Sequence, residues 1–531
     1  MNHRLEQDIG NASLRSGHMG EFMLRAILGL LAALTSVAAF AAEPGWTATE
    51  TAHFIIYSKS PKERIEKLAT EVESYDKLIR MATGIRDDLP PVKVRIYEVD
   101  DLKAVREAYG ADSYSGIAGF YSANALGPYL ITPRETGYVG EDFTPDLVLH
   151  HEYAHHMMLQ YFPAAYPGWY TEGFAELIGS SKIMKDGRIG YGMPARQRGH
   201  DIAVDWVPLQ ELLTNEKPWG LDRYAQGWAL THFFTFDKKR SGQFRQYLAA
   251  LNAGRSLEDA AKVFGNLNDL DREARRYVTS GSFEYRPVKV EVAQPVIKSV
   301  RPLSAGEAAL IPEVAAFSDY DLANFDKDGD RERERERRER NLGATRKVVA
   351  HYPNDPFALY FLAEAEYASG NYAQSEAASD RLLAIRPSDV HALARKAITM
   401  AILSKNLPQA QKLAQLKEAR DLAAKANRLN PADSLPLLAY YQSFHLAGQK
   451  APSLAVEGLM QVVSTDPADS FPRELLVDEL ASEGKWANAM AWLAPLANDP
   501  HDTPLRESAR KKMAWLKSQL EGHSETAQTA N

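Results

Sequence analysis

The sequence predicts an α+β domain, in which a β-sheet precedes a helical subdomain, followed by an all-α array of helical hairpins. Strand-like and helix-like hydrophobic patterns alternate from residue 46, and helical patterns dominate after Glu176. Further on, X-Pro pairs end at positions 353, 387, 431, 467 and 500, at intervals of 34, 44, 36 and 33 residues. A period near 34 residues is the length of one helical hairpin in a repeat array. The 531 residues are enough for both parts.

Composition excludes several classes of function. The chain has no cysteine, which excludes disulfides, thiolate catalysis and lipid attachment through an N-terminal cysteine. The formal net charge of −8 gives no electrostatic reason to expect nucleic acid binding.

The N-terminus has the pattern of a signal peptide. A basic start at Arg25 is followed by an apolar run from Ala26 to Ala38, and then by small residues at Ala39 and Ala41. We expect residues 1–41 to be a signal peptide cleaved after Ala41, with the polar residues 1–22 as a false-start extension, and a periplasmic or secreted protein. A membrane anchor is the alternative, but the run is at the short end of what spans a bilayer, so no stable span is expected after cleavage.

Residues 46–280 are expected to form the α+β domain. Its early part contains four strand-like runs, at residues 52–57, 92–97, 117–121 and 128–132. Helical patterns cover residues 62–81 and 101–109. The last two strands are separated by Asn124 and Gly127, which predicts that they pair.

The next segment holds the strongest motif of the chain. His151, Glu152 and His155 form H-E-x-x-H. Thr144, Pro145 and Asp146 upstream are typical of a helix start, so the motif is expected on a helix. Residues four apart share one helix face, so the two histidines can bind one Zn²⁺ and Glu152 can take a proton from a water at the metal.

A third ligand is expected from a second helix. Pro163 and Pro167 end the first helix, and a helical pattern resumes near Trp169. Glu172 then becomes the candidate third ligand. Glu176, one turn further on, is placed to accept the spare ring N–H of a ligating histidine.

H-E-x-x-H followed by E-G-x-A-E resembles the gluzincin zinc metallopeptidases. The resemblance is close over about 30 residues and loose over about 230. It implies a thermolysin-like fold, with His151, His155 and Glu172 as zinc ligands and Glu152 as general base. The spacing between His155 and Glu172 is shorter than in the related aminopeptidases, and their G-x-M-E-N signature is missing from residues 118–124. Exported bacterial peptidase-like proteins with C-terminal tetratricopeptide repeats are more similar.

One helix beyond the motif carries a further candidate. Tyr224, Trp228 and His232 share a helical face, which ordinarily indicates a buried aromatic stripe. The segment also resembles the gluzincin stretch whose tyrosine stabilises the oxyanion. The resemblance therefore implies Tyr224 as a catalytic hydrogen-bond donor, with His232 as a weaker candidate.

Residues 281–340 are expected to connect the two parts. The stretch from Arg331 to Arg340 alternates Arg and Glu, and residues 326–340 carry seven basic and seven acidic side chains. This balance argues against a nucleic-acid-binding segment and predicts a solvated helical spacer. Residues 341–520 are expected to form about four tetratricopeptide-like hairpins with a concave surface for a protein partner, and residues 521–531 a disordered tail.

These observations predict an exported zinc-dependent peptidase, more specifically an endopeptidase, that acts on a peptide or protein substrate. Its repeats would recruit the substrate or a partner protein. Two alternatives stay open: a catalytically vestigial periplasmic scaffold that acts through its repeats, and an aminopeptidase. An intact Glu152 argues against the scaffold, because a purely structural zinc site has no use for a base.

Overall fold

The computed structural model describes residues 45–529 except 87–89, 91, 111–115, 125, 138–141, 163, 205, 216–221, 319–327 and 499–503. The predicted signal peptide, residues 1–41, lies outside the described residues. No helix in the described part of the chain is long and apolar enough to cross a membrane.

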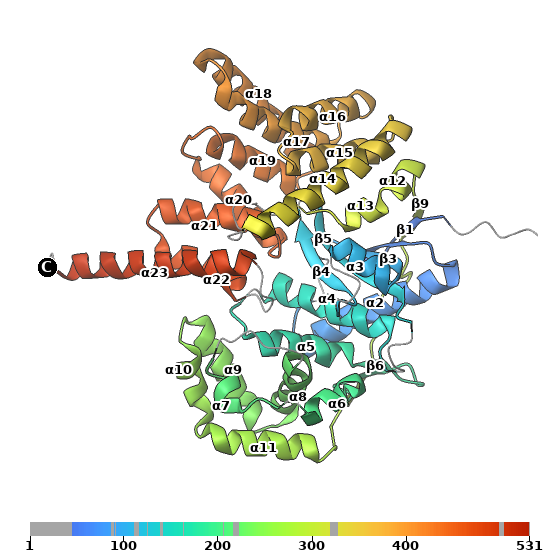
Figure 1. Ribbon diagram of the computed structural model, residues 1–531, viewed down its shortest axis with the longest axis vertical. Coiled ribbons are helices and arrows are strands. Elements are labelled where there is room, and N and C mark those ends of the chain that lie inside the picture. Colours follow the sequence, from blue (N-terminus) through green and yellow to red (C-terminus); the bar gives the residue numbers. More distant parts are fainter. Residues whose placement is uncertain are drawn as a thin grey trace, which may run out of the picture. The chain divides into compact units, whose positions relative to one another are not determined.

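The first domain contains a six-stranded mixed sheet, with the strands in the order β4-β5-β3-β2-β1-β9 (Figure 1). Its strands are β1 (Thr47–Glu50), β2 (Phe54–Ser58), β3 (Val94–Asp101), β4 (Phe120–Asn124), β5 (Gly127–Glu135) and β9 (Ser299–Pro302). Strand β3 is parallel to both of its neighbours, β2 and β5, and the remaining pairs are antiparallel. The four predicted strands are thus present, and the last two pair as expected.

Strand β9 comes from the segment that was expected only to connect the two parts. It pairs with β1 and forms one edge of the sheet, while β4 forms the other edge. Residues 281–340 also contain β8 (Arg286–Val288), α12 (Ala305–Ala309) and α13 (Ile311–Ala315). The connector is therefore partly built into the first domain, which sequence spacing alone could not indicate.

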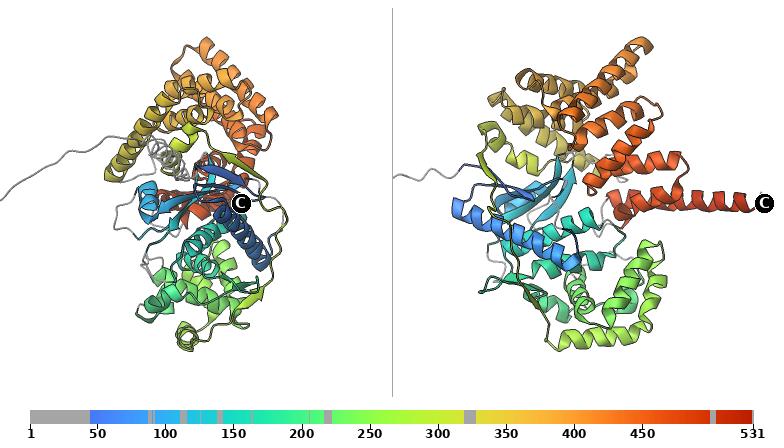
Figure 2. Two further views of the ribbon diagram at one scale, coloured as in Figure 1. Left: turned by 90° about the vertical axis from the view of Figure 1, so that its right-hand side faces the viewer. Right: turned by 180° about the vertical axis from the view of Figure 1, so that it is seen from behind.

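Side chains alternate between the two faces of the sheet along each strand, and each face packs against a different set of helices. Val94 and Ile96 of β3 pack with α2 (Lys62–Thr83), α4 (Pro145–Tyr161) and α5 (Gly168–Gly179) in one core. Tyr97 and Val99 of the same strand belong to a second core, which also contains α3 (Leu102–Tyr109). Helix α4 lies between the sheet and α5 (Figure 2).

A helical subdomain follows α5. It consists of α6 (Gly199–Val204), α7 (Leu209–Leu212), α8 (Asp222–Phe236), α9 (Arg240–Asn252), α10 (Leu257–Ala261) and α11 (Leu267–Thr279). Its core is aromatic: Trp169, Phe234 and Tyr247 are almost completely buried. Strands β6 (Lys182–Ile183) and β7 (Ile189–Tyr191) form a small sheet with β8 beside it.

The C-terminal part consists of successive helical hairpins, as the repeat period predicts. The first helices of the hairpins are α15 (Pro356–Ala368), α17 (Val390–Leu403), α19 (Ser434–His445) and α21 (Ser470–Ser482), and α23 (Pro504–Thr529) follows them. Their starts are 34, 44, 36 and 34 residues apart. The second helices are α16 (Tyr372–Ile385), α18 (Gln409–Leu429), α20 (Ser453–Thr465) and α22 (Trp486–Ala497). The long interval contains the longest second helix, α18. Helix α23 continues into the segment expected to be a disordered tail.

The Arg/Glu-rich stretch is helical, as predicted, and most of its side chains are exposed, but it is more than a spacer between the two parts. It belongs to α14 (Asp328–His351), which packs against α15. Arg338 and Glu334 are buried and pair at 2.9 Å, and Arg338 donates to the carbonyl of Ala368. Arg337 donates to the carbonyl of Ala316. Long arginine side chains satisfy backbone carbonyls at helix ends, so alternating charge does not exclude burial.

The repeat array shares a hydrophobic core with the sheet. Tyr97 and Ile131 of the sheet belong to the same cluster as Leu359, Phe361 and Leu362 of α15. The later repeats have a separate core, which includes Leu459 of α20 and Leu476 of α21. The first hairpin is therefore a structural part of the sheet domain, whereas the later hairpins pack mainly on one another.

We expect Phe361→Ala to destabilise the sheet as well as the repeats. Phe361 is fully buried in the shared core, and such a truncation costs about 3–5 kcal/mol. Hydrogen exchange should then show reduced protection in β3. The control Leu459→Ala removes an equally buried side chain from the second core, and it should leave β3 protected. Unchanged protection of β3 in Phe361→Ala would contradict a shared core.

Candidate metal centre

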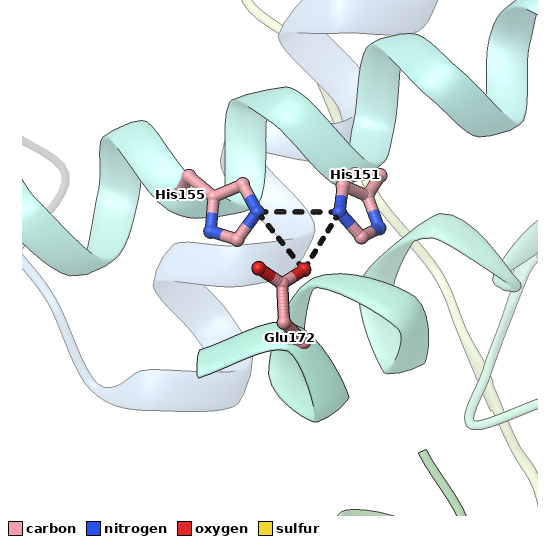
Figure 3. A group of neighbouring side chains, drawn as sticks. All are labelled: His151, His155 and Glu172. Carbon is pink, nitrogen blue, oxygen red and sulfur yellow. Dashed lines mark hydrogen bonds and ion pairs between the residues drawn. The ribbon is translucent and has the colours of Figure 1, made fainter. Parts of the chain in front are cut away.

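Helix α4 begins where the sequence predicts. The hydroxyl of Thr144 accepts a hydrogen bond from the Leu147 amide at 3.3 Å, and Pro145 occupies the first helical position. The helix continues to Tyr161, so His151, Glu152 and His155 lie on regular α-helix. The two histidines project from the same side of it (Figure 3).

Helix α5 runs beside α4 and brings Glu172 to the two histidines. The Nε2 atoms of His151 and His155 lie 3.2 Å apart. The Oε2 atom of Glu172 lies 3.4 Å from Nε2 of His151 and 3.6 Å from Nε2 of His155. The three residues that the motif spacing singled out therefore meet at one point.

The spacing of these three atoms suits a tetrahedral zinc ion. Zinc binds imidazole nitrogen and carboxylate oxygen at about 2.0–2.2 Å, which places its ligand atoms about 3.3–3.6 Å apart. Two of the three separations, 3.4 and 3.6 Å, lie within this range, and the third, 3.2 Å, lies just below it. Three atoms that all carry lone pairs converge on one point, and this arrangement favours a cation.

Burial differs among the site residues. Glu172 is completely buried and each histidine is 8% exposed, whereas Glu152 and Tyr224 are half-buried. The ligand set is therefore enclosed by protein, and the residue expected to act as the base remains accessible. A site that keeps a position open for water and substrate requires this arrangement.

Glu176 lies behind the first histidine, as its position one turn after Glu172 predicts. Its Oε1 is 3.4 Å from Nδ1 of His151 and accepts from Arg198 at 2.6 Å, and its Oε2 accepts from Gln197 at 3.1 Å. Burial opposes ionisation of Glu176, but His151 and Arg198 lower its pKa to about 2. Burial also opposes the charge on His151, yet Glu172 and Glu176 raise its pKa to about 10. This corner of the site therefore favours a positive charge.

Arg198 and Gln197 were not found by sequence reasoning. Both belong to a short 3-10 helix, η1 (Arg196–Arg198), which has no motif of its own. The available signal was indirect: a buried carboxylate such as Glu176 requires a hydrogen-bonded or charged partner. Spacing along the chain could not say which basic residue supplies it.

Tyr224 lies beside the histidines. Its ring centroid is 6.0 Å from that of His151, and the Arg198 guanidinium lies 4.9 Å from the centre of the Tyr224 ring. His232, the other candidate on α8, is occupied elsewhere. Its two ring nitrogens contact the Tyr277 hydroxyl at 2.6 Å and the Gly192 carbonyl at 2.8 Å. His232 thus has a structural role.

Two glycines set the position of Tyr224. Helices α5 and α8 cross at Gly173 and Gly227 with their backbones in contact. A Cβ at Gly227 would lie 2.4 Å from the Trp169 carbonyl oxygen, and a Cβ at Gly173 would lie 2.2 Å from the Gly227 oxygen. Glu172 and Tyr224 stand next to this crossing, so the glycines of E-G-x-A-E and Y-x-x-G are required by close packing.

A second group of histidine and carboxylates lies behind α4. His53 contacts Glu73 through Nδ1 at 2.7 Å, and its Nε2 lies 3.6 Å from Asp76. Arg80 also pairs with Asp76, at 2.7 Å, and the Tyr153 hydroxyl donates to it at 2.6 Å. The carboxylates use different nitrogens of His53 and already have partners. We therefore assign this group to the packing of α2 against α4.

We expect Gly227→Ala to lower the free energy of unfolding by about 1–3 kcal/mol, and with it the melting temperature, because the added methyl group forces α8 away from α5. The matched control is Gly242→Ala on α9, where a Cβ meets nothing within 4 Å. This control should be neutral or slightly stabilising, since alanine favours a helix more than glycine does. Equal melting temperatures of the two variants would contradict the close crossing.

Comparison with solved structures finds proteins described as tetratricopeptide repeat proteins. No protein-family model matches the sequence, and no curated protein matches it. A thermophilic TPR protein of Thermus thermophilus is 22% identical, with a TM-score of 0.30 over 33% of this chain and 90% of that chain. A tetratricopeptide repeat protein of Parabacteroides merdae is 14% identical, with a TM-score of 0.27 over 53% of this chain and 88% of that chain. Yeast Tom70 is 11% identical, with a TM-score of 0.25 over 70% of this chain and 69% of that chain.

The class of the C-terminal part therefore rests on its own geometry. Successive helical hairpins with a period near 34 residues define a tetratricopeptide-like array. Membership of the first domain in the gluzincin family stays a prediction from its motifs.

Proposed function

We propose that the protein is a zinc-dependent peptidase. The observation that carries the proposal is the triangle formed by His151, His155 and Glu172, with separations of 3.2–3.6 Å and a half-buried Glu152 beside it. A structural zinc site usually has four protein ligands, whereas a catalytic site has three and leaves one position for water. The proposal also includes export, which rests on the predicted signal peptide at residues 1–41.

Each residue has a defined task in this proposal. Zinc, when bound, polarises the scissile carbonyl and acidifies the attacking water. Glu152 takes the proton of that water and delivers it to the leaving amine. Tyr224 donates a hydrogen bond to the oxyanion. Arg198 binds Glu176, which contacts the ligand His151, and it also lies over the ring of the hydrogen-bond donor Tyr224. Arg198 therefore helps to position both His151 and Tyr224.

The sheet supplies a place for an extended peptide. Among the described strands, β4 pairs with β5 and forms an edge of the sheet, and an edge strand is where an extended peptide can be added to a sheet. The start of β4 lies close to the base, because a Cβ at Gly119 would be 3.3 Å from Cγ of Glu152. An extended substrate along β4 would therefore reach the proposed catalytic residues.

A second candidate function is that of a binding scaffold that acts through its repeats. The observation in its favour is the tetratricopeptide-like array. Its later hairpins have a hydrophobic core of their own, so their folding does not depend on packing against the sheet. The two functions give opposite results with a peptide library. A peptidase cleaves it and loses cleavage on Glu152→Gln, whereas a scaffold leaves the library intact.

For zinc, we expect one equivalent in the purified protein and none in His155→Ala, because two remaining ligands hold the ion poorly. Glu172→Ala should also lose the metal. Glu176→Ala should retain it with an affinity about 10–100-fold lower, the usual effect of losing a residue that orients a ligand. Plasma emission spectroscopy after dialysis measures the content, and His391→Ala on the distant α17 is the control. Full occupancy in His155→Ala would rule out this centre.

For catalysis, we expect Glu152→Gln to keep zinc and fold but to abolish measurable cleavage, because the amide cannot take the proton. Tyr224→Phe should keep zinc and lower turnover about 10²–10³-fold, the loss typical of one oxyanion donor. The control Tyr277→Phe removes a hydroxyl that contacts His232, so stability should change and turnover should not. Wild-type turnover in Tyr224→Phe would leave its ring with a packing role only.

A further inference from the structure

Helix α4 carries a second stripe next to the metal ligands. Val148, Glu152 and His156 are each four residues apart and therefore share a face. This stripe contains the proposed base, while the neighbouring stripe contains His151 and His155. Strand β4 and the residue before it lie along the base-carrying stripe.

The first contact between strand and stripe is at Gly119. A Cβ there would lie 2.4 Å from Cγ1 of Val148, 3.0 Å from the Ile131 carbonyl and 3.3 Å from Cγ of Glu152. Only glycine allows the chain to approach α4 so closely. Two residues later on the same side of the strand, Tyr121 makes the second contact: its hydroxyl is 3.1 Å from Nδ1 of His156.

His156 is itself held from behind. It is 2% exposed, and its ring stacks on that of Tyr153 with centroids 5.5 Å apart. The Tyr153 hydroxyl in turn donates to Asp76 of α2 at 2.6 Å. The imidazole is therefore held by contacts with α4 and α2, and it lies next to His155 in the sequence, on the helix that carries two of the candidate ligands.

We propose that Tyr121 and His156 are positioning residues, which fix the edge strand β4, and a peptide bound along it, relative to Glu152 and the three ligands. The inference rests on the proposed peptidase function. Neither residue contacts the reacting atoms. Their hydrogen bond sets where a long substrate lies, and it has no effect on a substrate too short to reach β4.

The test is Tyr121→Phe, which removes only the hydroxyl. For an extended peptide of about ten residues, we expect kcat/KM to fall about tenfold, mostly through kcat, on the scale of one hydrogen bond. For a blocked dipeptide, the change should be less than about twofold, since this substrate does not span the strand. Zinc content should equal that of the wild type, and hydrogen exchange should speed up at residues 119–124.

Matched variants separate positioning from general destabilisation. Tyr129→Phe removes a hydroxyl from β5 on the opposite face of the sheet, and it should leave the ratio of the two rates unchanged. His156→Gln keeps a hydrogen-bonding group and should restore most of the activity on the long peptide, whereas His156→Phe should match Tyr121→Phe. The double variant Tyr121→Phe/His156→Phe should lose no more than either single variant, because both remove one interaction.

The outcomes distinguish this inference from the proposed function. Equal losses on the long and the short substrate, or unchanged exchange at residues 119–124, would overturn the inference and leave the peptidase intact. Hydrolysis of neither substrate by the zinc-loaded wild type would overturn the peptidase function and the inference with it.

Discussion

The burial of one carboxylate constrains the rest of the first domain. Glu172 is completely buried against His151 and His155, and an ion so far from water costs several kcal/mol unless its partners are held in place. Helices α4, α5 and α8 must therefore keep fixed distances. Glycines at the crossings meet this requirement. A Cβ at Gly173 would collide with α8, and one at Gly179 would lie 3.2 Å from the Leu147 oxygen of α4.

Charged layers on both sides of α4 support the same geometry. On the side of α5, Arg198 and Glu176 hold the outer nitrogen of His151. On the side of α2, Asp76 binds Arg80 and Tyr153 in a buried network. Since α4 is held from two sides, the fold itself restrains the positions of its histidines, and a restrained ligand set reduces the entropy lost when a cation binds.

The sequence was informative where the signals are local. The cap at Thr144, the stop after Tyr161 and the return of the chain near Trp169 depend on neighbouring residues, so they predicted α4, α5 and the meeting of His151, His155 and Glu172. Contacts between distant segments were not predictable. Nothing in the composition of residues 299–302 indicated that β9 would pair with β1. The burial of Glu334 and Arg338 also depends on a helix end at Ala368, thirty residues away from Arg338.

The same limit applies to the relation between the repeats and the sheet. A repeat array read from its period alone looks like a separate module, yet its first hairpin completes the sheet core through Phe361 and its neighbours. Contacts of the later hairpins with the first domain include polar ones, such as the Gln160 amide, which donates to the Thr465 carbonyl at 3.1 Å. Close by in the chain, burial raises the pKa of Asp466 to about 6, while Arg95 of β3 and Arg473 act in the opposite direction.

These two kinds of contact have different consequences. The apolar core of the first hairpin is extensive, so this hairpin is not available to a partner without unfolding part of the sheet domain. A polar contact such as that between Gln160 and Thr465 exchanges with water at little net cost, because a hydrogen bond contributes only about 1 kcal/mol. Gln160 stands in the last turn of α4, on the same helix as His151 and His155. The later hairpins therefore meet the first domain next to the helix that carries the candidate ligands, and they do so through a contact that exchanges easily with water.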